Sequence, residues 1–231
     1  TTGAGSNQLQ LAFGSTGGTI CVAASNTCGT SSNSCKAVTV GKERIKLVSY
    51  NLLNYPDLSN VTADTTQRNP YFRTIITALE PDILVTQETQ SQAGVNGFLS
   101  NVMNKTSGNY SAGTFIDGFD TDNALFYKNT KFAFISNTRI RTTLRDINEF
   151  KLVHLLSGDT LRIYSVHLKA SNTSADEAQR AQEVDTLRKY TNQLSPGSNF
   201  IVCGDFNIYR SSESAYQKLL REVMFEGKPD L

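Results

Sequence analysis

The stretch NFIVCGDFNIYR, residues 199–210, runs apolar for four residues and then turns abruptly polar. The apolar run Phe200–Cys203 is typical of a buried strand, because consecutive apolar side chains suit a sheet that is covered on both faces. Asp205 and Asn207 follow at once, and both residue types favour turns. Taken alone, the stretch is either a strand that ends in an ordinary turn or one wall of a functional site.

Three further segments share this pattern of an apolar run that ends in a residue suited to metal or phosphate. IKLVSYN ends at Asn51, DILVTQE ends at Glu88 and LRIYSVH ends at His167. Each residue alone is more often a cap, a solvated side chain or a structural histidine. Ligand sites in open α/β sheets lie at the carboxyl ends of strands, so strands that end alike predict one shared site.

The residue types of this predicted site suit metal-assisted hydrolysis of a phosphoester. Glu88 is the natural first ligand for a hydrated Mg²⁺, which needs one or two carboxylates and takes substrate phosphate as a further ligand. The amides of Asn51 and Asn207 can donate to phosphate oxygens where charge develops. His167 can donate to phosphate or transfer a proton, and Asp205 can orient or activate an attacking water.

Helix signals lie between the apolar segments. Residues 69–80 predict a helix with Asn69 as N-cap and Pro70 at the first position. Residues 174–194 predict a second helix, opened by a capping box of Ser174 and Glu177. A third helix is expected over residues 212–223.

Hairpin signals in the sequence help to indicate the fold class. Residues 122–128 and 131–136 predict one hairpin, and residues 149–156 and 161–168 predict another around a Gly-Asp turn. Mixed strands and helices with several hairpins favour an α+β fold over a purely parallel sheet.

Residues 1–41 form a different region, rich in Thr, Ser, Gly and Asn, in which Lys36 is the first charged residue. Residues 19–40 predict two strands joined by a long turn, and they resemble the last two strands of PKD-like, immunoglobulin-type modules of bacterial surface and secreted proteins. We therefore expect residues 1–41 to be the tail of such a module with its linker, and residues 42–231 to be a catalytic domain.

The N-terminal cysteines give information about the cellular compartment in which the protein resides. In a hairpin over residues 19–40, Cys21 and Cys35 fall opposite each other, which makes a cross-strand disulfide plausible, and the alternative is three unpaired cysteines with Cys28. A disulfide implies an oxidising compartment, so we expect a secreted protein or one at the surface of a bacterium. Cys203, in contrast, is expected to be a buried packing residue.

Length, composition and net charge limit the classes of protein to which the chain can belong. The 231 residues, 39% of them hydrophobic and 19% charged, suit one good-sized core with a smaller module attached. A formal net charge of +1 supplies no global basic field for nucleic acid. No apolar run is long enough to span a bilayer, and no protein partner is predicted.

Four motifs in this order, VSYNLLNY, PDILVTQE, YSVHLKAS and IVCGDFN, resemble the endonuclease/exonuclease/phosphatase superfamily of deoxyribonuclease I. The resemblance covers residues 45–231 and implies a four-layer α/β sandwich of two packed, mostly antiparallel sheets flanked by helices. It implies Glu88 as the metal ligand, with Asn51 beside it. It also implies His167 as a phosphate-facing residue, Asp205 as the carboxylate that aligns the nucleophile, and Asn207 as the amide that stabilises the transition state.

The resemblance also suggests substrate-binding residues. Arg145 precedes a strand where family members often carry an Arg that contacts substrate phosphate, and the alternative is a surface Arg paired with Asp146. Asp122 and Asn123 lie where substrate-contacting residues occur. His154 alternates with apolar neighbours along its strand, so we interpret it as structural.

The sequence departs from the family in one respect, since an Asp-His pair is expected near the C-terminus of the domain. The chain has two histidines, His154 and His167, and neither follows Asn207. We therefore expect a C-terminally truncated domain, and we expect the 231-residue chain to be nearly inactive although the full-length protein is a hydrolase.

These sequence features lead to three hypotheses about the function of the protein. The first is a secreted, Mg²⁺-dependent phosphodiesterase that acts as a nuclease on nucleic acid, with Mn²⁺ or Ca²⁺ as alternative ions. The second is a phosphatase or a lipid- or sugar-phosphate phosphodiesterase of the same superfamily. The third is an inactive surface binding or adhesion module.

Overall fold

A computed structural model describes residues 17–23, 25–27, 29–38, 43–56, 64–106 and 108–221 of the chain. The chain divides into two compact units, Thr1–Arg44 and Ile45–Leu231. The predicted boundary between residues 41 and 42 lies outside the described residues, as does the predicted end of the last helix beyond residue 221.

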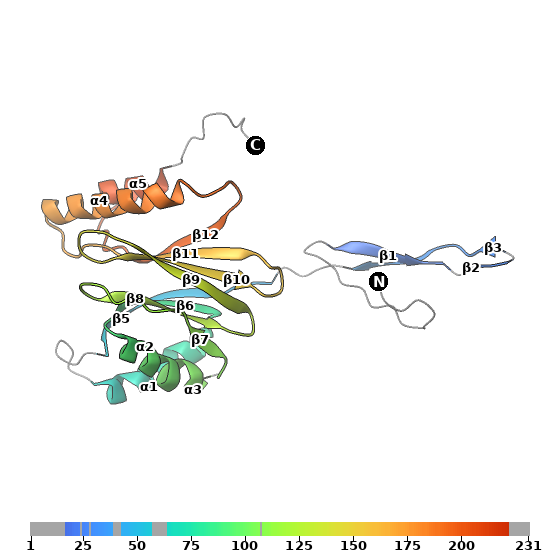
Figure 1. The fold of residues 1–231 in the computed structure, drawn as a ribbon, viewed down its shortest axis with the longest axis horizontal. Helices are drawn as coiled ribbons and strands as arrows, with labels where there is room; N and C mark the ends of the chain where they lie inside the picture. Colours follow the sequence, from blue (N-terminus) through green and yellow to red (C-terminus); the bar gives the residue numbers. More distant parts are fainter. Residues whose placement is uncertain are drawn as a thin grey trace. The chain divides into compact units, whose positions relative to one another are not determined.

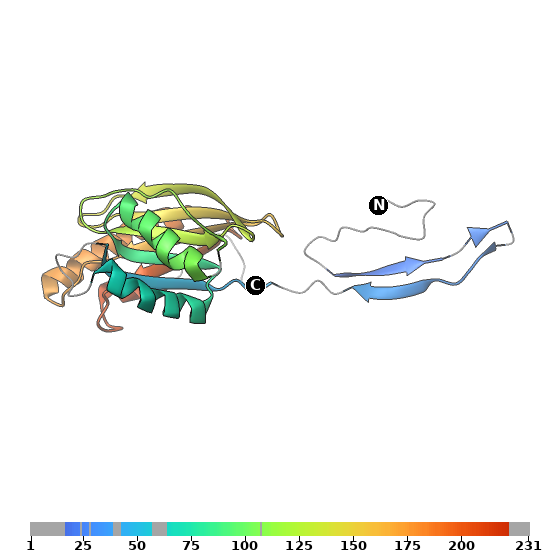
Figure 2. The same ribbon diagram turned by 90° about the horizontal axis from the view of Figure 1, so that it is seen from below.

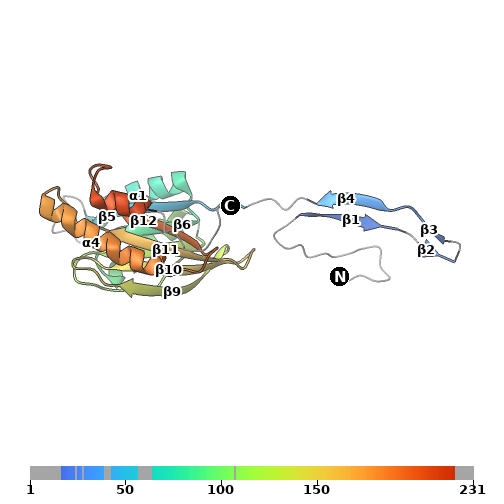
Figure 3. The ribbon, with the colours of Figure 1, turned by 90° about the horizontal axis from the view of Figure 1, so that it is seen from above.

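The N-terminal unit contains a disulfide-linked pair of strands. Strand β1 (Gly18–Val22) pairs antiparallel with β4 (Ser34–Val38), and the short strands β2 (Ser25–Asn26) and β3 (Gly29–Thr30) pair beyond them (Figure 3). The register places Cys21 opposite Cys35, and the two residues form a disulfide. The predicted N-terminal hairpin is therefore confirmed.

The second unit has four layers, with helices on the outside and two sheets between them (Figure 1). The first sheet has the order β5 (Leu47–Tyr55), β6 (Ile83–Thr89), β8 (Asp122–Lys128) and β7 (Tyr110–Ala112). The second sheet has the order β12 (Asn199–Asp205), β11 (Thr160–His167), β10 (Ile147–His154) and β9 (Phe132–Ile140).

Each sheet contains one parallel pair, β5 with β6 and β11 with β12, and its other pairs are antiparallel. The predicted sandwich of two mostly antiparallel sheets is confirmed. The parallel pairs matter for the site, because the ends of paired parallel strands lie next to each other.

Helices cover the outer face of each sheet. Helices α1 (Thr65–Leu79), α2 (Gln92–Phe98) and α3 (Asn104–Thr106), with a π-helical turn at Leu99–Met103, cover the first sheet (Figure 2). Helices α4 (Ser174–Thr191) and α5 (Ser214–Leu220) cover the second (Figure 1). No helix in the described part of the chain is both long enough and apolar enough to span a membrane.

Three apolar cores hold these layers together. The core between the sheets includes Val85, Phe150 and Cys203. Burial raises the pKa of the Cys203 thiol to about 12, as expected for a packing residue.

The other two cores lie between the sheets and their helices. Under the first sheet, Phe98 makes edge or tilted contacts with three other rings, those of Tyr55, Phe72 and Phe126. Under the second sheet, α4 and α5 pack on β11 and β12 through Val166, Val184, Leu187 and Ala215.

The two helix N-caps that were predicted are both shifted, and α5 begins at Ser214 and not at residue 212. Helix α1 begins at Thr65 because Asp64 caps it, accepting from Gln67 N, so Pro70 lies inside the helix. Asn69, predicted as the cap, is instead buried and accepts a hydrogen bond from the Tyr55 hydroxyl at 3.1 Å. Helix α4 is opened by a capping box one residue earlier than predicted, from Thr173 and Asp176.

One predicted hairpin is wrong and the other is confirmed. Strands β8 and β9 follow each other closely in the chain but belong to different sheets, so the turn at residues 129–131 carries the chain from one sheet to the other. Strands β10 and β11 form the second predicted hairpin. A turn signal shows where a chain reverses, but it does not show which neighbour a strand will pair with.

Candidate active site

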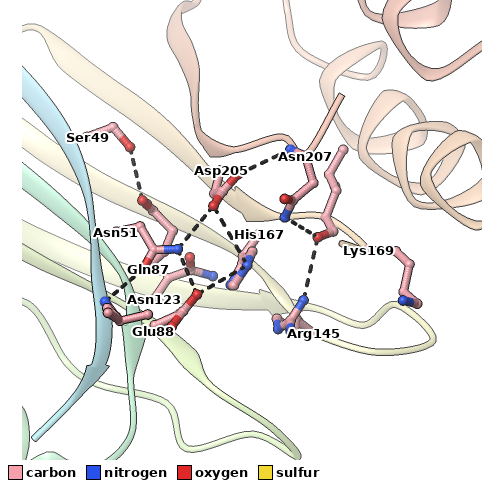
Figure 4. A network of polar contacts seen from close by, with 12 residues as sticks. Ser49, Asn51, Gln87, Glu88, Asn123, Arg145, His167, Lys169, Asp205 and Asn207 are labelled. Atoms are coloured by element: carbon pink, nitrogen blue, oxygen red, sulfur yellow. Dashed lines mark hydrogen bonds and ion pairs between the residues drawn. The ribbon is translucent and has the colours of Figure 1, made fainter. Parts of the chain in front are cut away.

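Two sheets contribute the residues that the sequence predicts for the site (Figure 4). Asn51 and Glu88 come from the parallel strands β5 and β6 of the first sheet, and His167 and Asp205 come from the parallel strands β11 and β12 of the second. Asn207 follows Asp205. The structure therefore brings together the four strand ends that the sequence pattern singled out.

The Asn51 amide joins two carboxylates from different sheets. Its Nδ2 donates to Glu88 Oε1 at 2.8 Å and to Asp205 Oδ2 at 3.0 Å. Its Oδ1 accepts from the backbone N–H of Leu53 at 2.8 Å, which fixes the orientation of the amide. Because both amide hydrogens are donated to carboxylates, Asn51 acts in this arrangement as a holder of carboxylates rather than as a direct phosphate donor.

The backbone around Glu88 adopts conformations that side chains rarely favour. Leu53, Asn54 and Glu88 have φ of 53°, 52° and 59°, and the Asn54 N–H donates to Glu88 Oε2 at 3.0 Å. Arg68 reaches this turn from α1 and donates to the carbonyls of Leu52 and Leu53. Backbone strain of this kind concentrates at functional sites, where the surrounding contacts hold it in place.

His167 faces both carboxylates. Its Nε2 lies 3.8 Å from Glu88 Oε1 and 4.0 Å from Asp205 Oδ2. Burial, and then the positive charge of Arg145, lower its pKa below 6.5, although Asp205 and Glu88 act in the opposite direction. The imidazole is therefore neutral at neutral pH. Its Nδ1 is buried and has no hydrogen-bond partner among the described residues.

Asp205 and Asn207 are held to the loop that follows β11. The backbone N–H of Leu168 donates to the Asp205 carbonyl at 2.9 Å, and Asn207 Nδ2 donates to the Leu168 carbonyl at 3.0 Å. Gly204 makes this approach feasible, because a Cβ there would lie 1.9 Å from the Val166 carbonyl oxygen. The glycine before Asp205 is thus required by the close contact between β11 and β12.

Arg145 lies beside this cluster, but not with the partner that the alternative interpretation named. Its Nε pairs with Asp120 Oδ2 at 2.8 Å, and its Nη1 lies 3.5 Å from the Leu168 carbonyl. Asp146 pairs instead with Arg139, at 2.8 Å. Arg145 is thus close to the site through Leu168, in a position compatible with the predicted contact to substrate phosphate.

Asp122 and Asn123 differ in their surroundings. Asp122 is 5% exposed and accepts from the Gly118 N–H at 2.9 Å, and burial, followed by the charges of Asp117 and Asp146, raises its pKa to about 6. Asn123 is 1% exposed. Its side chain lies between the two sheets, bonded to Asn148 and Ser165 of the second sheet, and its contact with substrate stays a prediction.

The contacts of Asn123 belong to a buried polar network that no sequence motif predicted. Asn123 Nδ2 donates to the Asp146 carbonyl and to Asn148 Oδ1, and Asn123 Oδ1 accepts from Ser165 Oγ at 2.9 Å. Ser165 in turn accepts from Gln87 Nε2 at 3.3 Å. The network links the strands that carry Glu88 and His167. The polar residues inside apolar strands, such as Gln87, were the only sequence signal for it.

The donor set of the site fits a hard divalent cation. Glu88 and Asp205 supply carboxylate oxygens, which Mg²⁺, Mn²⁺ and Ca²⁺ prefer. Within the described ranges no group of three or more His, Cys, Asp or Glu side chains forms a complete metal cage. Mg²⁺ does not require one, because one or two carboxylates suffice when waters and substrate oxygens complete the shell.

A model of the endonuclease/exonuclease/phosphatase family matches residues 48–223, which is most of the chain. The chain belongs to this family. The prediction from the sequence motifs is therefore confirmed, and the family is one of phosphoester hydrolases that generally depend on divalent metals. No curated protein matches the chain significantly.

Solved structures resemble this family member in fold. The human Nocturnin catalytic domain with bound sulfate is 22% identical, with a TM-score of 0.55 over 75% of this chain and 68% of that one. Danio rerio TDP2 complexed with single-strand DNA product is 16% identical, with a TM-score of 0.54 over 72% and 62%. The mannosyl-6-phosphatase Bt3783 of Bacteroides thetaiotaomicron is 20% identical, with a TM-score of 0.56 over 77% and 70%.

These likenesses concern the fold alone. The family member described here spans 64%, 62% and 64% of the length of three TDP2 structures. One of the similar structures is a phosphatase and another holds a DNA product, so fold similarity does not separate the two substrate classes.

Proposed function

We propose that this protein hydrolyses phosphodiester bonds with the help of a divalent cation, and that its substrate is nucleic acid. One observation carries the proposal. The carboxylates of Glu88 and Asp205, from two different sheets, both accept hydrogen bonds from Asn51 Nδ2 and both face His167 Nε2. Such a convergence of carboxylates, amide and imidazole suits an electrophilic phosphate centre.

The residues that would hold the cation are Glu88 and its neighbour Asp205. A divalent cation bound there would neutralise charge on a phosphoryl oxygen and act as a Lewis acid. Asn51 orients both carboxylates through its amide nitrogen. The Asn54 N–H does the same for the second oxygen of Glu88. Mg²⁺ is the proposed ion, with Mn²⁺ and Ca²⁺ as alternatives.

The remaining residues meet the phosphate and the attacking water. The neutral imidazole of His167 can donate a hydrogen bond to a phosphate oxygen or accept a proton. Asp205 is proposed to align the attacking water. Asn207 donates one hydrogen to Leu168, so its second amide hydrogen can stabilise charge that develops on the phosphate. Arg145, through its guanidinium, is proposed to contact a neighbouring phosphate.

The proposal also includes the location of the protein and the nature of its N-terminal unit. The disulfide between Cys21 and Cys35 supports an oxidising compartment, and thus a protein that is secreted or lies at the surface of a bacterium. The paired strands of the N-terminal unit support the proposal that residues 1–41 are the tail of a PKD-like module.

The test compares three substrates with Mg²⁺ and with a chelator. Supercoiled plasmid, RNA and a phosphomonoester are incubated with the 231-residue chain and with the longest natural form of the protein. We expect the longest natural form to cleave plasmid or RNA, the chelator to abolish that cleavage, and the 231-residue chain to be nearly inactive. Phosphomonoester hydrolysis without cleavage of either nucleic acid would overturn the nuclease proposal in favour of a phosphatase.

Variants of two glutamates test the metal assignment. Glu88→Gln should lower turnover by at least ~10²-fold, because a preorganised charge at the reacting phosphate is lost. Glu80→Gln, on an exposed side chain at the end of α1, is the matched control and should keep full turnover. Equal activity of the two variants would show that Glu88 holds no catalytic cation.

A further inference from the structure

A buried ion pair lies outside the strand-end residues of the candidate site. Arg180 of α4 and Glu213, the N-cap of α5, both have side chains that are 0% exposed. Arg180 Nε and Nη2 each lie 2.9 Å from Glu213 Oε2. Among the ion pairs of the described residues, this is the one whose two side chains are completely buried.

Stability alone does not explain such a pair. Removing two charges from water is costly, and well-packed apolar side chains of similar volume often serve stability equally well. A guanidinium differs from an apolar side chain in one respect, because its planar fork directs several hydrogen bonds along fixed directions. The groups that Arg180 and Glu213 contact therefore indicate what the pair does.

Arg180 holds the loop that follows β11, here called the β11 loop and comprising residues 168–173. Its Nη1 donates to the carbonyls of Lys169 at 2.8 Å and Ser171 at 2.6 Å. Ser171 has a φ of 75°, so the loop bends sharply at this contact. His167 immediately precedes the β11 loop.

Glu213 holds the loop that follows β12, here called the β12 loop and comprising residues 206–212. Its Oε1 accepts from the backbone N–H of Tyr209 at 2.9 Å. The Tyr209 ring lies against the guanidinium, with its centroid 5.3 Å from Arg180 Cζ. Asn207 lies in this loop, two residues before Tyr209.

The two loops also meet on the side of the site. Leu168 N donates to the Asp205 carbonyl, and Asn207 Nδ2 donates to the Leu168 carbonyl, at 2.9 and 3.0 Å. The loops are thus joined at the site through Leu168 and joined behind it through Arg180 and Glu213. Two attachments hold their relative position where one would allow rotation.

We propose that the Arg180–Glu213 ion pair positions the β11 and β12 loops so that His167 and Asn207 face the same phosphate. The inference deepens the proposed function, on which its catalytic part rests. Arg180 and Glu213 are positioning residues, since they contact the loops and not the reacting atoms.

The main test replaces the pair by apolar side chains, in the double variant Arg180→Met with Glu213→Leu. We expect a folded protein with a thermal unfolding midpoint close to that of the unaltered protein. We also expect the Leu168 N–H to exchange its hydrogen about tenfold faster, because local opening of the loops becomes easier. Turnover should fall ~10–100-fold at an unchanged pH optimum, as is typical when an outer hydrogen-bond partner is lost.

A second variant keeps the proposal testable if the double variant does not fold. Arg180→Lys retains the charge opposite Glu213 but loses the fork to the two carbonyls. It should also accelerate exchange of the Leu168 N–H. Lys218→Met is the matched control, since it breaks an exposed ion pair with Asp185 between the same two helices and should change neither exchange nor turnover.

The outcomes separate this inference from the proposed function. Unaltered exchange of the Leu168 N–H and unaltered turnover in a folded double variant would overturn the positioning role. Absence of phosphoester hydrolysis by the unaltered protein would overturn the proposed function, while hydrogen exchange would still decide whether the ion pair orders the loops.

Discussion

Replacing Asp122 by Asn should make the protein more stable at neutral and alkaline pH. Asp122 is 5% exposed, and its pKa is raised to about 6 from the ordinary value of 3.8, chiefly by burial. The folded protein keeps the proton up to about pH 6, whereas the unfolded chain releases it near 3.8. Between these values the folded state binds more protons, so its stability falls as pH rises.

The size of the effect follows from the two pKa values. At about 1.36 kcal/mol for each pKa unit, a charged Asp122 destabilises the fold by roughly 3 kcal/mol above pH 7. Asn is neutral at every pH and retains an oxygen that can accept from the Gly118 N–H. We therefore expect Asp122→Asn to raise the free energy of unfolding by about 3 kcal/mol at pH 8, and by well under ~1 kcal/mol at pH 4.

Urea denaturation at both pH values measures this difference. Asp159→Asn, on an exposed residue of the turn between β10 and β11, is the control and should change stability by no more than about 0.5 kcal/mol. An Asp122→Asn variant whose gain in stability is the same at pH 4 and pH 8 would refute the reasoning. If Asp122 serves the substrate, as predicted, the more stable variant should also be less active.

Two further predictions concern packing. Phe98→Ala should lower the free energy of unfolding by about 3–5 kcal/mol, since Phe98 is fully buried among three other rings, and a loss below ~1 kcal/mol in urea denaturation would contradict that packing. Gly204→Ala should prevent β12 from pairing closely with β11, because its Cβ would lie 1.9 Å from the Val166 carbonyl oxygen and its φ is 140°. Gly97→Ala in α2, where the nearest atom is 3.8 Å away, should be neutral or stabilising, and equal thermal midpoints for the two glycine variants would contradict this account.

Much of the candidate site could be predicted because its residues share a local pattern. Asn51, Glu88, His167 and Asp205 each end an apolar strand, and the carboxyl ends of paired parallel strands converge. The cross-strand disulfide could be anticipated for a similar reason, since the spacing of Cys21 and Cys35 sets their register in a hairpin.

Contacts between distant segments could not be predicted in this way. Asn123 carries the residue type of a substrate ligand, yet the packing of β8 against β10 and β11 places it in the core between the sheets. Arg145 was expected either at the substrate or on Asp146, and its ion-pair partner in the structure is Asp120, from the loop before β8, and not Asp146. In the sequence, Arg180 is one of many charged residues of a predicted helix. Its role as a buried ion-pair partner becomes visible only in the fold, where α4 packs against the loop before α5.

The sequence by itself determined which residue types stand at the strand ends and which family the chain resembles, because both depend on short-range patterns along the chain. Only the tertiary structure decided that β8 and β9 belong to different sheets, that Asn51 holds two carboxylates together, and that Arg180 and Glu213 join two loops. These features depend on which faces are buried together, and the free energy of that burial is a property of the whole fold.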